Sequence, residues 1–390
     1  MPPKQFLDND FYKFTMQQAV CELFPDTEVK YAFHNRGKTK FKSEVAVNLQ
    51  KYICEMGGLA LSKTYSKYLE THYPCFKKTY IDFLSTYRYN PSEVKINFKN
   101  GTLDLIIEGP WYRTILWEVP IMAAISELHY QSIDGPFNPY MTGSIIQKVN
   151  ELKTLSDHHN SFTYADFGTR RRHSFESQYY YVMEAARSKG PFVGTSNVHM
   201  SIINQTKAIG TQAHEWFSFM AAVYGPKIAN TIGMEKWIEV YKGKLGIALT
   251  DTFTTDVFLR SFDSKYARIF DGTRQDSGDP VAYIPLLVDH YRSLGIDPLS
   301  KKIVFSEGIN KMETIHNIMY ACKEKIIPTF GIGTWLTNDF EGITPLNMVI
   351  KLHSVKHGND WIPAIKLSDS PTKNTGDPDE ILAYKKVFNI

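Results

Sequence analysis

The sequence predicts an α/β protein in which a βα barrel in the middle of the chain is joined to an α+β domain built from the two chain ends. In the middle, a theme of a short apolar run, a polar glycine-rich loop and a helix-like stretch recurs seven times. Strands that alternate with helices in this way are parallel. The two ends instead carry alternating apolar runs around turn signals, which is typical of antiparallel hairpins. The alternative for the middle is an open doubly wound sheet, whose ligand site would use fewer of the loops.

The bulk composition is that of an ordinary globular protein. The 390 residues allow two or more domains, or one barrel with additions, and the chain is 43% hydrophobic and 22% charged. A formal net charge of +3 gives no support for nucleic acid as the main partner. No apolar stretch approaches the roughly 20 residues that span a bilayer, and residues 1–10 have no apolar signal core. The cysteines lack metal-type spacing and are expected to be reduced thiols: Cys21, Cys54, Cys75 and Cys322. We expect a soluble, cytoplasmic protein with no membrane partner.

Two turns define the α+β domain, which we assign to residues 1–125 and 345–390. Asn100-Gly101 and Gly358-Asn359 each separate alternating apolar runs, and Asn-Gly readily takes the positive φ angles of a tight turn. The expected elements are a helix at 8–23, a strand at 29–33, helical segments within 61–87 broken near Pro74, and hairpin strands at 94–98, 103–107, 348–352 and 361–367.

The repeats of the middle, residues 126–344, all place a polar loop after an apolar run. In a βα barrel the loops that follow the strands share one face, and active sites are built there. Several polar loops in the same phase are therefore stronger evidence than any one of them. The runs begin near Phe162, Phe192, Lys207, Leu245, Ala267, Ile303 and Ile326.

The loop Gly272 to Asp279 is the densest in hydrogen-bonding groups. We expect it to follow a strand at Ala267–Phe270 and to precede a helix from about Val281 to Leu294. Asp279-Pro280 is explained by a capped helix start. That explanation does not cover Arg274, whose planar fork suits a carboxylate, a phosphate or an aromatic ring. Nor does it cover Asp276, which suits ribose hydroxyls or Mg²⁺ waters.

Three consecutive arginines, Arg170 to Arg172, follow another predicted strand. They would repel one another unless an anion lies among them, and because their side chains diverge, one or two are expected to reach a site. A solvated basic surface explains at least one of the three. Phe167, just before them, is either a core residue or a ring that stacks on a planar ligand.

His214 lies at the start of a predicted helix, after Gly210-Thr211-Gln212-Ala213. The helix dipole disfavours a positive charge there, by about 0.3–1 kcal/mol at an exposed site. A neutral imidazole is a competent nucleophile, and a phosphoryl group on it would face the N–H groups of the helix. The structural alternative is a histidine bonded to a neighbouring carboxylate such as Glu215. Among these loops we favour function, and we count Glu215 as a second candidate catalytic residue.

Backbone amides after the last two predicted strands are candidates for phosphate binding. The loops are Ser306-Glu307-Gly308 and Gly331-Ile332-Gly333-Thr334. Asp251 and Glu307 are further candidates for ribose or metal contacts, or they simply cap their loops. No Gly-x-x-x-x-Gly-Lys is present, so a Walker-type loop does not bind ATP.

Together these motifs resemble the nicotinate phosphoribosyltransferase family. The matching segments run in the expected order from residue 8 to 334, and Lys366-Leu367-Ser368 is similar as well. They are Asp8-x-Asp10-x-Tyr12-Lys13, Phe167-Gly-Thr-Arg170, Gly194-Thr-Ser-Asn197, Gly210-Thr-Gln-Ala-His214-Glu-Trp216, Arg274-Gln-Asp-Ser-Gly-Asp279 and Phe330-Gly-Ile-Gly-Thr334. The resemblance implies an irregular, incomplete βα barrel and an α+β domain from the chain ends.

The resemblance also implies a reaction. Nicotinate and phosphoribosyl pyrophosphate would give nicotinate mononucleotide and pyrophosphate, coupled to ATP hydrolysis through a phosphorylated His214, with Mg²⁺ held mainly through the pyrophosphate. The family usually acts as a homodimer, and Tyr12 matches a tyrosine that reaches the neighbouring subunit's site. The implied nicotinate contacts are Tyr12, Phe167, Ser196, Thr211 and Arg274. The implied phosphoribosyl pyrophosphate contacts are Arg170, Asp251, Asp276, Glu307, Gly308, Gly331, Gly333 and Thr334.

Ser196 bears on the choice of substrate. Relatives that use nicotinamide carry an aspartate in this loop, which would repel a carboxylate, whereas serine tolerates it. A nicotinamide or quinolinate phosphoribosyltransferase is the nearest alternative. A barrel aldolase or isomerase is another, but no lysine lies in the loops to form a Schiff base. A non-catalytic phosphosugar-binding barrel gives no reason for His214 beside an anion site.

Overall fold

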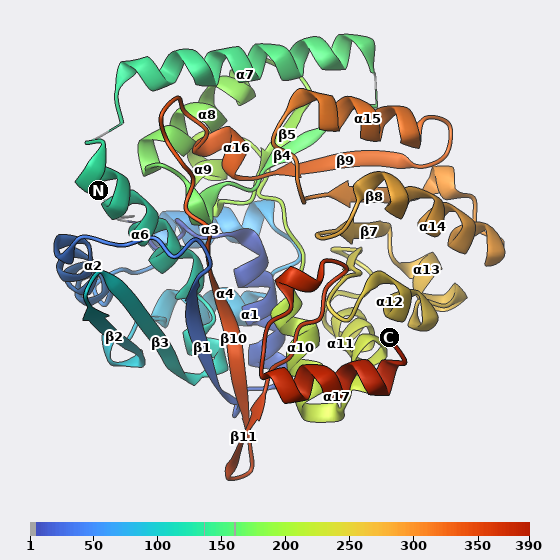
Figure 1. The fold of residues 1–390 in the computed structure, drawn as a ribbon, viewed down its shortest axis with the longest axis horizontal. Helices are drawn as coiled ribbons and strands as arrows, with labels where there is room; N and C mark the ends of the chain where they lie inside the picture. The colour runs from blue at the N-terminus through green and yellow to red at the C-terminus, as the bar shows by residue number, and fades with distance from the viewer. Residues whose placement is uncertain (1–4, 136, 160) are drawn as a thin grey trace.

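The computed structural model describes residues 5–135, 137–159 and 161–390, and these form two sheets of different kinds (Figure 1). The parallel strands come from the middle of the chain and the antiparallel strands from its ends, which confirms the expected α/β class. A search of the described helices finds none with the length and apolar character needed to cross a bilayer.

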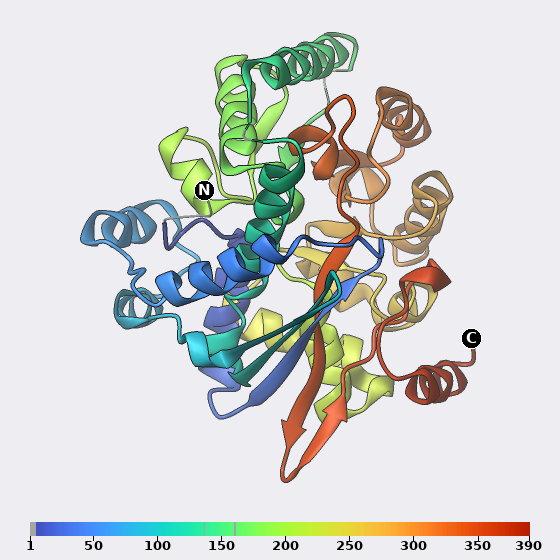
Figure 2. The same cartoon turned by 60° about the vertical axis from the view of Figure 1, so that its left-hand side comes forward.

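The antiparallel sheet joins the two ends of the chain. Its strand order is β11-β10-β1-β3-β2, so β1 pairs on one side with β3 and on the other with β10 from the far end of the sequence (Figure 2). Both predicted hairpins are confirmed, and φ is 51° at Asn100 and 77° at Gly101, as the turn chemistry requires. The strands are β1 (Glu28–Asn35), β2 (Val94–Lys99), β3 (Thr102–Pro110), β10 (Met348–His357) and β11 (Asp360–Pro363).

The parallel sheet has the order β5-β4-β9-β8-β7-β6. Every neighbouring pair in it is parallel, as the alternation of strands and helices predicts. Its strands are β4 (Tyr164–Asp166), β5 (Phe192–Thr195), β6 (Ile247–Leu249), β7 (Gly272–Gln275), β8 (Lys302–Phe305) and β9 (Ile327–Ile332).

The strand predicted near Lys207 is wrong. Only Ala208 pairs, in a parallel bridge with Thr195, whose backbone N–H donates to the carbonyl of Lys207 at 3.0 Å. The chain then turns at Gly210, where an added Cβ would stand 3.0 Å from the backbone nitrogen of Tyr12. Pairing stops after one residue because the chain has to pass closely against the helix that carries Tyr12.

The strand predicted at Ala267–Phe270 is also wrong. Those residues close a short helix, α13 (Ser264–Ile269), which begins where the Asp263 side chain accepts hydrogen bonds from two backbone N–H groups. The strand is instead the start of the polar loop itself, β7. Gly272 permits this because a Cβ there would lie 2.1 Å from the backbone oxygen of Lys302 on β8.

The helices agree more closely with the sequence. The stretch at 61–87 is divided into two helices around Pro74, and the helix after Asp279 begins at Pro280. The longer ones are α1 (Phe11–Leu23), α2 (Ser43–Met56), α3 (Lys63–His72), α4 (Lys78–Thr86), α6 (Glu118–Ile133), α7 (Pro139–His158), α8 (Phe175–Arg187), α10 (His214–Tyr224), α11 (Ala229–Tyr241), α14 (Pro280–Ser293), α15 (Met312–Cys322) and α17 (Pro378–Phe388). The short ones, besides α13, are α5 (Trp111–Thr114), α9 (Val198–Ile203), α12 (Thr255–Ser261) and α16 (Thr334–Thr337).

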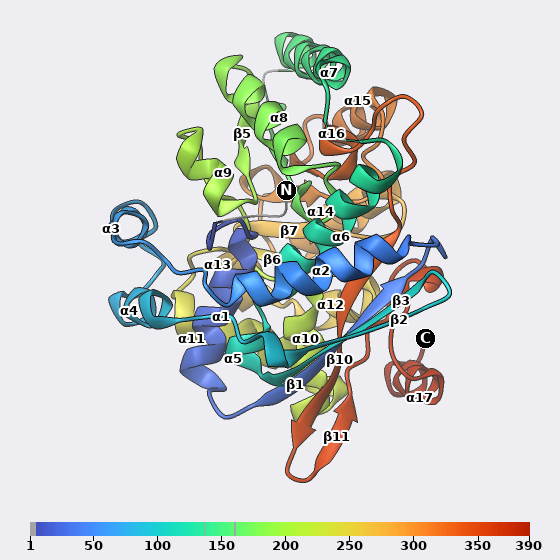
Figure 3. The ribbon, with the colours of Figure 1, turned by 90° about the vertical axis from the view of Figure 1, so that its left-hand side faces the viewer.

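Helix α10 packs against strand β10 of the antiparallel sheet and against α11 (Figure 3). Its Phe219 ring lies 4.1 Å from the ring of Trp111, centroid to centroid, and its Ser218 hydroxyl donates to the carbonyl of Ile365 at 2.9 Å. Burial of such large aromatic side chains contributes strongly to packing. The first residue of this helix, His214, is therefore held where the loops of the parallel sheet meet the antiparallel sheet.

Candidate active site

One pocket gathers most of the residues that the sequence predicts for a site. It lies between the loops after the parallel strands, the start of α1 and strand β10. Its wall includes the predicted residues Tyr12, Phe167, Arg170, Ser196, His214, Glu215, Arg274, Asp276, Gly331, Gly333 and Thr334.

Four predicted residues lie outside this wall. The Thr211 hydroxyl donates to the carbonyl of Ile247 on β6 at 3.1 Å, so it braces the loop. Asp251 is buried behind His214. Glu307 forms an ion pair with Lys373 at 2.6 Å, and Gly308 is in an exposed turn with a φ of 68°. The structure therefore brings Asp251 near the site and leaves Glu307 and Gly308 at its outer edge.

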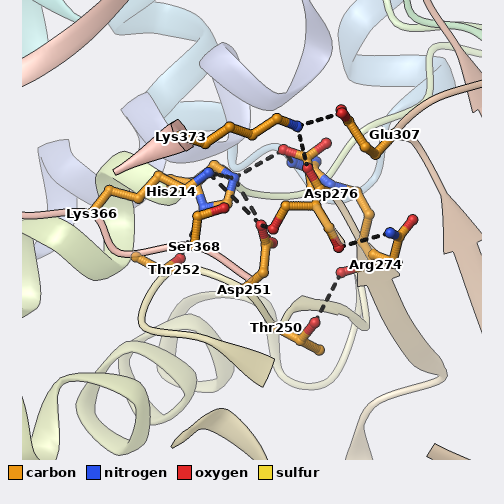
Figure 4. Close-up of polar contacts among 12 residues, drawn as sticks. His214, Thr250, Asp251, Thr252, Arg274, Asp276, Glu307, Lys366, Ser368 and Lys373 are labelled. Atoms are coloured by element: carbon orange, nitrogen blue, oxygen red, sulfur yellow. Dashed lines mark hydrogen bonds and ion pairs between the residues drawn. The ribbon is translucent and has the colours of Figure 1, made fainter. Parts of the chain in front are cut away.

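His214 is surrounded by polar groups on both ring nitrogens (Figure 4). Its Nδ1 lies 3.0 Å from the Thr252 hydroxyl, and its Nε2 lies 2.9 Å from Asp276 Oδ2 and 3.0 Å from Lys366 Nζ. Burial first, and the Lys366 charge second, lower the pKa of His214 to about 4. Glu215 is bonded to Lys13 instead, so the carboxylate partner of this histidine is Asp276. The imidazole is thus neutral near pH 7, as predicted, although burial and a lysine contribute more than the helix terminus.

Asp276 links the histidine to the arginine of the same loop. Its Oδ1 accepts a hydrogen bond from the Ser306 hydroxyl at 2.8 Å, and its Oδ2 lies 3.7 Å from Arg274 Nη2. Burial alone would raise the pKa of Asp276, but Arg274 and His214 hold it well below its usual range. A permanently ionised carboxylate therefore stands beside a neutral imidazole.

Asp251 provides a second carboxylate close to His214. Its Oδ2 accepts from the Ser277 hydroxyl at 2.5 Å, whereas its buried Oδ1 has no hydrogen-bond partner among the described residues. Ligand atoms of His214, Asp251 and Asp276 all lie within 4.8 Å of one another. Carboxylate oxygens are the protein ligands that Mg²⁺ prefers, so the two aspartates fit such an ion.

Cations converge on the pocket from both sheets. Arg170 and Arg171 follow β4 and Arg274 lies in β7, while Lys351 on β10 and Lys366 come from the chain's C-terminal part. Burial and the nearby Lys366 lower the pKa of Lys351 to about 7. Lysines do reach this pocket, Lys351 from β10 and Lys366 from the segment after β11, so the absence of lysine from the loops does not exclude a Schiff base.

The three arginines diverge as predicted. Arg172 points away from the pocket and forms a bidentate ion pair with Asp8, at 2.9 and 2.8 Å, with both side chains fully buried. Arg170 and Arg171 line the pocket, and the Arg170 side chain is 37% exposed into it. One arginine is thus structural and two line the pocket, where Arg170 also lies 3.5 Å from Glu118 Oε1.

Phe167 and Gly331 are placed together by a close contact. A Cβ on Gly331 would lie 2.2 Å from Cε2 of the Phe167 ring. Any residue other than glycine would therefore displace the ring. Phe167 is half-buried with part of its ring facing the pocket. This is the arrangement expected of a ring that stacks on a planar ligand rather than of a core residue.

Tyr12 lies in the pocket of its own chain. The N–H of Phe11 donates to the carbonyl of Ser196 at 2.7 Å, and Asp10 forms a bridge with Asn197, which fixes the start of α1 against this pocket. The start of α1 thus places Tyr12 in the wall of this chain's own pocket, and the implied reach of Tyr12 into a neighbouring subunit stays a prediction.

Ser196 is accompanied by a carboxyl group at the same point of the pocket. The Ser196 hydroxyl donates to Asp10 Oδ1 at 2.7 Å, and Asp10 also lines the pocket. Burial raises the pKa of this carboxyl above its usual value. An acidic group therefore stands at this point of the wall even though the loop itself carries serine.

A neutral histidine, the ionised Asp276 and converging basic side chains around a half-buried ring are the features of an enzyme pocket for an anionic, planar-ringed substrate. Two family models match the chain: the nicotinate phosphoribosyltransferase N-terminal domain over residues 7–126 and the nicotinate phosphoribosyltransferase (NAPRTase) family over residues 162–390. The chain belongs to the nicotinate phosphoribosyltransferase family, which confirms the resemblance seen in the sequence.

Curated relatives and solved structures agree over the whole length. Nicotinate phosphoribosyltransferases from Chromohalobacter salexigens and Desulforapulum autotrophicum are 46% and 45% identical to the chain, covering 98% and 99% of it and 98% of each relative. The crystal structure of nicotinate phosphoribosyltransferase from Porphyromonas gingivalis superposes with a TM-score of 0.95 at 38% identity, covering 100% of both chains. That from Vibrio cholerae has a TM-score of 0.93 at 31% identity, covering 100% of this chain and 95% of the other.

Proposed function

We propose that the chain transfers the phosphoribosyl group of phosphoribosyl pyrophosphate to nicotinate, the first step of NAD salvage from nicotinate. A bond forms between the pyridine nitrogen and the anomeric carbon as the bond from that carbon to pyrophosphate breaks. The products are nicotinate mononucleotide and pyrophosphate. The observation that supports this is the convergence, in a chain of this family, of Phe167, Arg274 and the pocket cations around one cavity.

Each residue of the pocket has a role that suits its chemistry. Phe167 stacks on the pyridine ring, Arg274 holds the ring from the opposite loop, and Asp276 holds ribose hydroxyls. Arg170 and the backbone amides of Gly333 and Thr334 bind phosphate. Such preorganised groups stabilise the charge that develops as pyrophosphate leaves. When bound, Mg²⁺ would neutralise the pyrophosphate, and Asp251 and Asp276 are the carboxylates that fit it.

We further propose that ATP hydrolysis is coupled to this transfer through His214. Nε2 carries the ring proton in the tautomer that bonds to the ionised Asp276, and Nδ1 then accepts from the Thr252 hydroxyl. As Nε2 attacks the γ-phosphorus of ATP and ADP leaves, Asp276 takes that proton. Lys366, 3.0 Å away, is placed to offset the charge of the phosphoryl group, which water later removes as inorganic phosphate.

Two structural predictions remain part of the proposal. The domains are assigned to 1–125 with 345–390 and to 126–344. The parallel sheet is taken as an irregular, incomplete barrel whose gap between β5 and β6 is spanned by the segment around Lys207 to Thr211, which hydrogen-bonds to both strands. A cytoplasmic homodimer is likewise proposed from the family resemblance.

The test is formation of nicotinate mononucleotide from nicotinate and phosphoribosyl pyrophosphate with Mg²⁺, with and without ATP. His214→Asn, which cannot be phosphorylated, should lose ATP stimulation and the labelled phosphoenzyme but keep basal transfer. The matched control is His72→Asn, because His72 is exposed on α3 and does not line the pocket. This variant should keep both the ATP stimulation and the labelled phosphoenzyme. No product under any condition refutes the transferase, and unchanged ATP stimulation in His214→Asn refutes the phosphohistidine.

Because Asp10 lines the pocket, nicotinamide is the competing substrate to test. A carboxyl group at the wall of the pocket can accept a hydrogen bond from a carboxamide, which nicotinamide offers and nicotinate does not. Competition between the two bases in the same assay separates the functions. We expect nicotinate to be preferred because three arginines and two lysines line the pocket.

A further inference from the structure

Lys13 is the most deeply buried cation next to the pocket, and the proposed reaction gives it no role. It lies in the first turn of α1 and is fully buried. Its Nζ lies 2.6 Å from Glu118 Oε2 and 2.5 Å from Glu215 Oε2, so one ammonium joins two carboxylates from different helices. Glu118 opens α6, and Glu215 follows His214 at the start of α10.

The second oxygen of each carboxylate contacts a different part of the protein. The other oxygen of Glu118, Oε1, lies 3.5 Å from Arg170 Nη1. The other oxygen of Glu215, Oε1, accepts a hydrogen bond from the Tyr31 hydroxyl at 3.2 Å, and that hydroxyl accepts from Trp111 Nε1 at 2.9 Å. Lys13 is thus the centre of a chain of contacts that runs from Arg170 to the helix turn that carries His214.

The charges of this group balance only while Lys13 is present. Lys13 and Arg170 oppose Glu118 and Glu215, two positive and two negative charges. Burial opposes ionisation of both carboxylates. Lys13 and Arg170 still hold the pKa of Glu118 below its usual value, whereas burial keeps the pKa of Glu215 raised although Lys13 lowers it. Removing one partner of a buried ion pair leaves an uncompensated charge, which is far more costly than replacing the whole pair. Without Lys13, Arg170 would be left with two carboxylates, and only Lys351 nearby would help to offset the charge of Glu118.

We propose that Lys13 is a positioning residue for the transferase reaction. By neutralising Glu118 and Glu215 together, it leaves the Arg170 guanidinium free to extend into the pocket toward phosphate. It also fixes the first turn of α10 with His214. The inference rests on the proposed binding of phosphate by Arg170. A lysine serves here because its compact ammonium is a point charge that two carboxylates from separate helices can share.

The experiment measures the Kd of phosphoribosyl pyrophosphate with Mg²⁺ by calorimetry, which requires no turnover and no ATP. Lys13→Met keeps the length of the side chain but removes its charge, and we expect it to weaken binding by about tenfold or more, ~1.4 kcal/mol. Lys13→Met combined with Glu215→Gln leaves Glu118 and Arg170 as a balanced pair. We expect this double variant to recover binding to within about threefold of the wild type.

The control is another buried lysine. Lys301 donates to the carbonyl of Phe270 at 2.7 Å, at the opposite end of β8 from the loop that carries Ser306, and Lys301→Met should bind the substrate as the wild type does. Thermal unfolding checks that every variant is folded at the assay temperature. A role in packing alone would make the double variant no better than Lys13→Met, and that result, or normal binding by Lys13→Met, overturns the proposal.

Arg170→Gln separates this inference from the proposed function. Weaker binding in that variant supports the assignment of Arg170 to phosphate. Normal binding refutes that assignment, and a charge-dependent recovery in the Lys13 series would then show that Lys13 acts through α10 instead. Failure of ATP coupling would appear only as a missing phosphoenzyme in the wild type and would leave these binding constants unaffected.

Discussion

The low pKa of His214 predicts a specific dependence of stability on pH. The folded protein lowers this pKa from 6.5 to about 4, which corresponds to roughly 3 kcal/mol at about 1.4 kcal/mol per pKa unit. Between these two values the unfolded chain binds the proton and the folded chain does not. The free energy of unfolding must therefore fall as the pH decreases through this window, and it must be fully retained above 6.5.

The assay is urea unfolding in metal-free buffer, followed by the fluorescence of the six tryptophans. From about pH 7.5 to about pH 5, His214 alone should reduce the free energy of unfolding by ~2 kcal/mol, given the shift to about 4. His214→Asn carries no titrating group at this position. Its own decrease over the same range should be smaller than that of the wild type by this amount, because all other groups titrate in both proteins.

Lys366→Met gives an intermediate case. It removes the cation 3.0 Å from Nε2 but keeps the burial that is the larger cause, so part of the difference should remain. Equal decreases in the wild type and His214→Asn would refute the reasoning, because the folded imidazole would then titrate as it does in the unfolded chain.

Two further changes test contacts described above. Gly331→Ala would place a Cβ 2.2 Å from the Phe167 ring, and overpacking of this kind costs about 1–3 kcal/mol. Because the ring would have to move, we expect the KM for nicotinate to rise about tenfold. An unchanged KM in initial-rate assays would show that this ring does not hold the substrate. Arg172→Met leaves Asp8 buried without its partner and should lower the free energy of unfolding by about 3–5 kcal/mol. Arg171→Met should change the free energy of unfolding by no more than about 0.5 kcal/mol. Similar losses for the two variants in urea unfolding would contradict the assignment of Arg172 to structure and Arg171 to the pocket.

Features that depend on local chemistry could be read from the sequence. Asn100-Gly101 specified its hairpin through two positive φ angles. The Asp279 side chain accepts from the backbone N–H of Val281 at 2.9 Å, as its place before Pro280 predicts. In both cases, neighbours in the sequence supply all the interactions that decide the conformation.

The two wrong strands show where local reading fails. Ala267–Phe270 is as apolar as a buried strand, but the capping side chain of Asp263 starts a helix just before it. The polar segment that follows becomes a strand only because β8 approaches Gly272 so closely. A contact with a strand thirty positions further along the chain decides the outcome, and periodicity within one segment carries no information about it.

The candidate site divides in the same way. Phe167, His214 and Asp276 were predicted because loops after alternating strands have to share a face. Lys351 and Glu118 were missed, because they come from the other sheet and from α6. One signal was available for Lys351: a lysine between the apolar residues Ile350 and Leu352 of an alternating strand must project to the face opposite theirs.

The position of β1 between β3 and β10 has a consequence for synthesis of the chain. Roughly 300 residues separate β1 from β10, the strand that covers its second edge. At a synthesis rate of ~5–20 residues per second, this edge of β1 stays unpaired for about 15–60 s while the rest of the chain is made. An uncovered strand edge is a template for pairing with other chains. The pocket that β10 helps to line is also absent throughout this interval, so a nascent chain is exposed to aggregation before it acquires any capacity to bind its substrates.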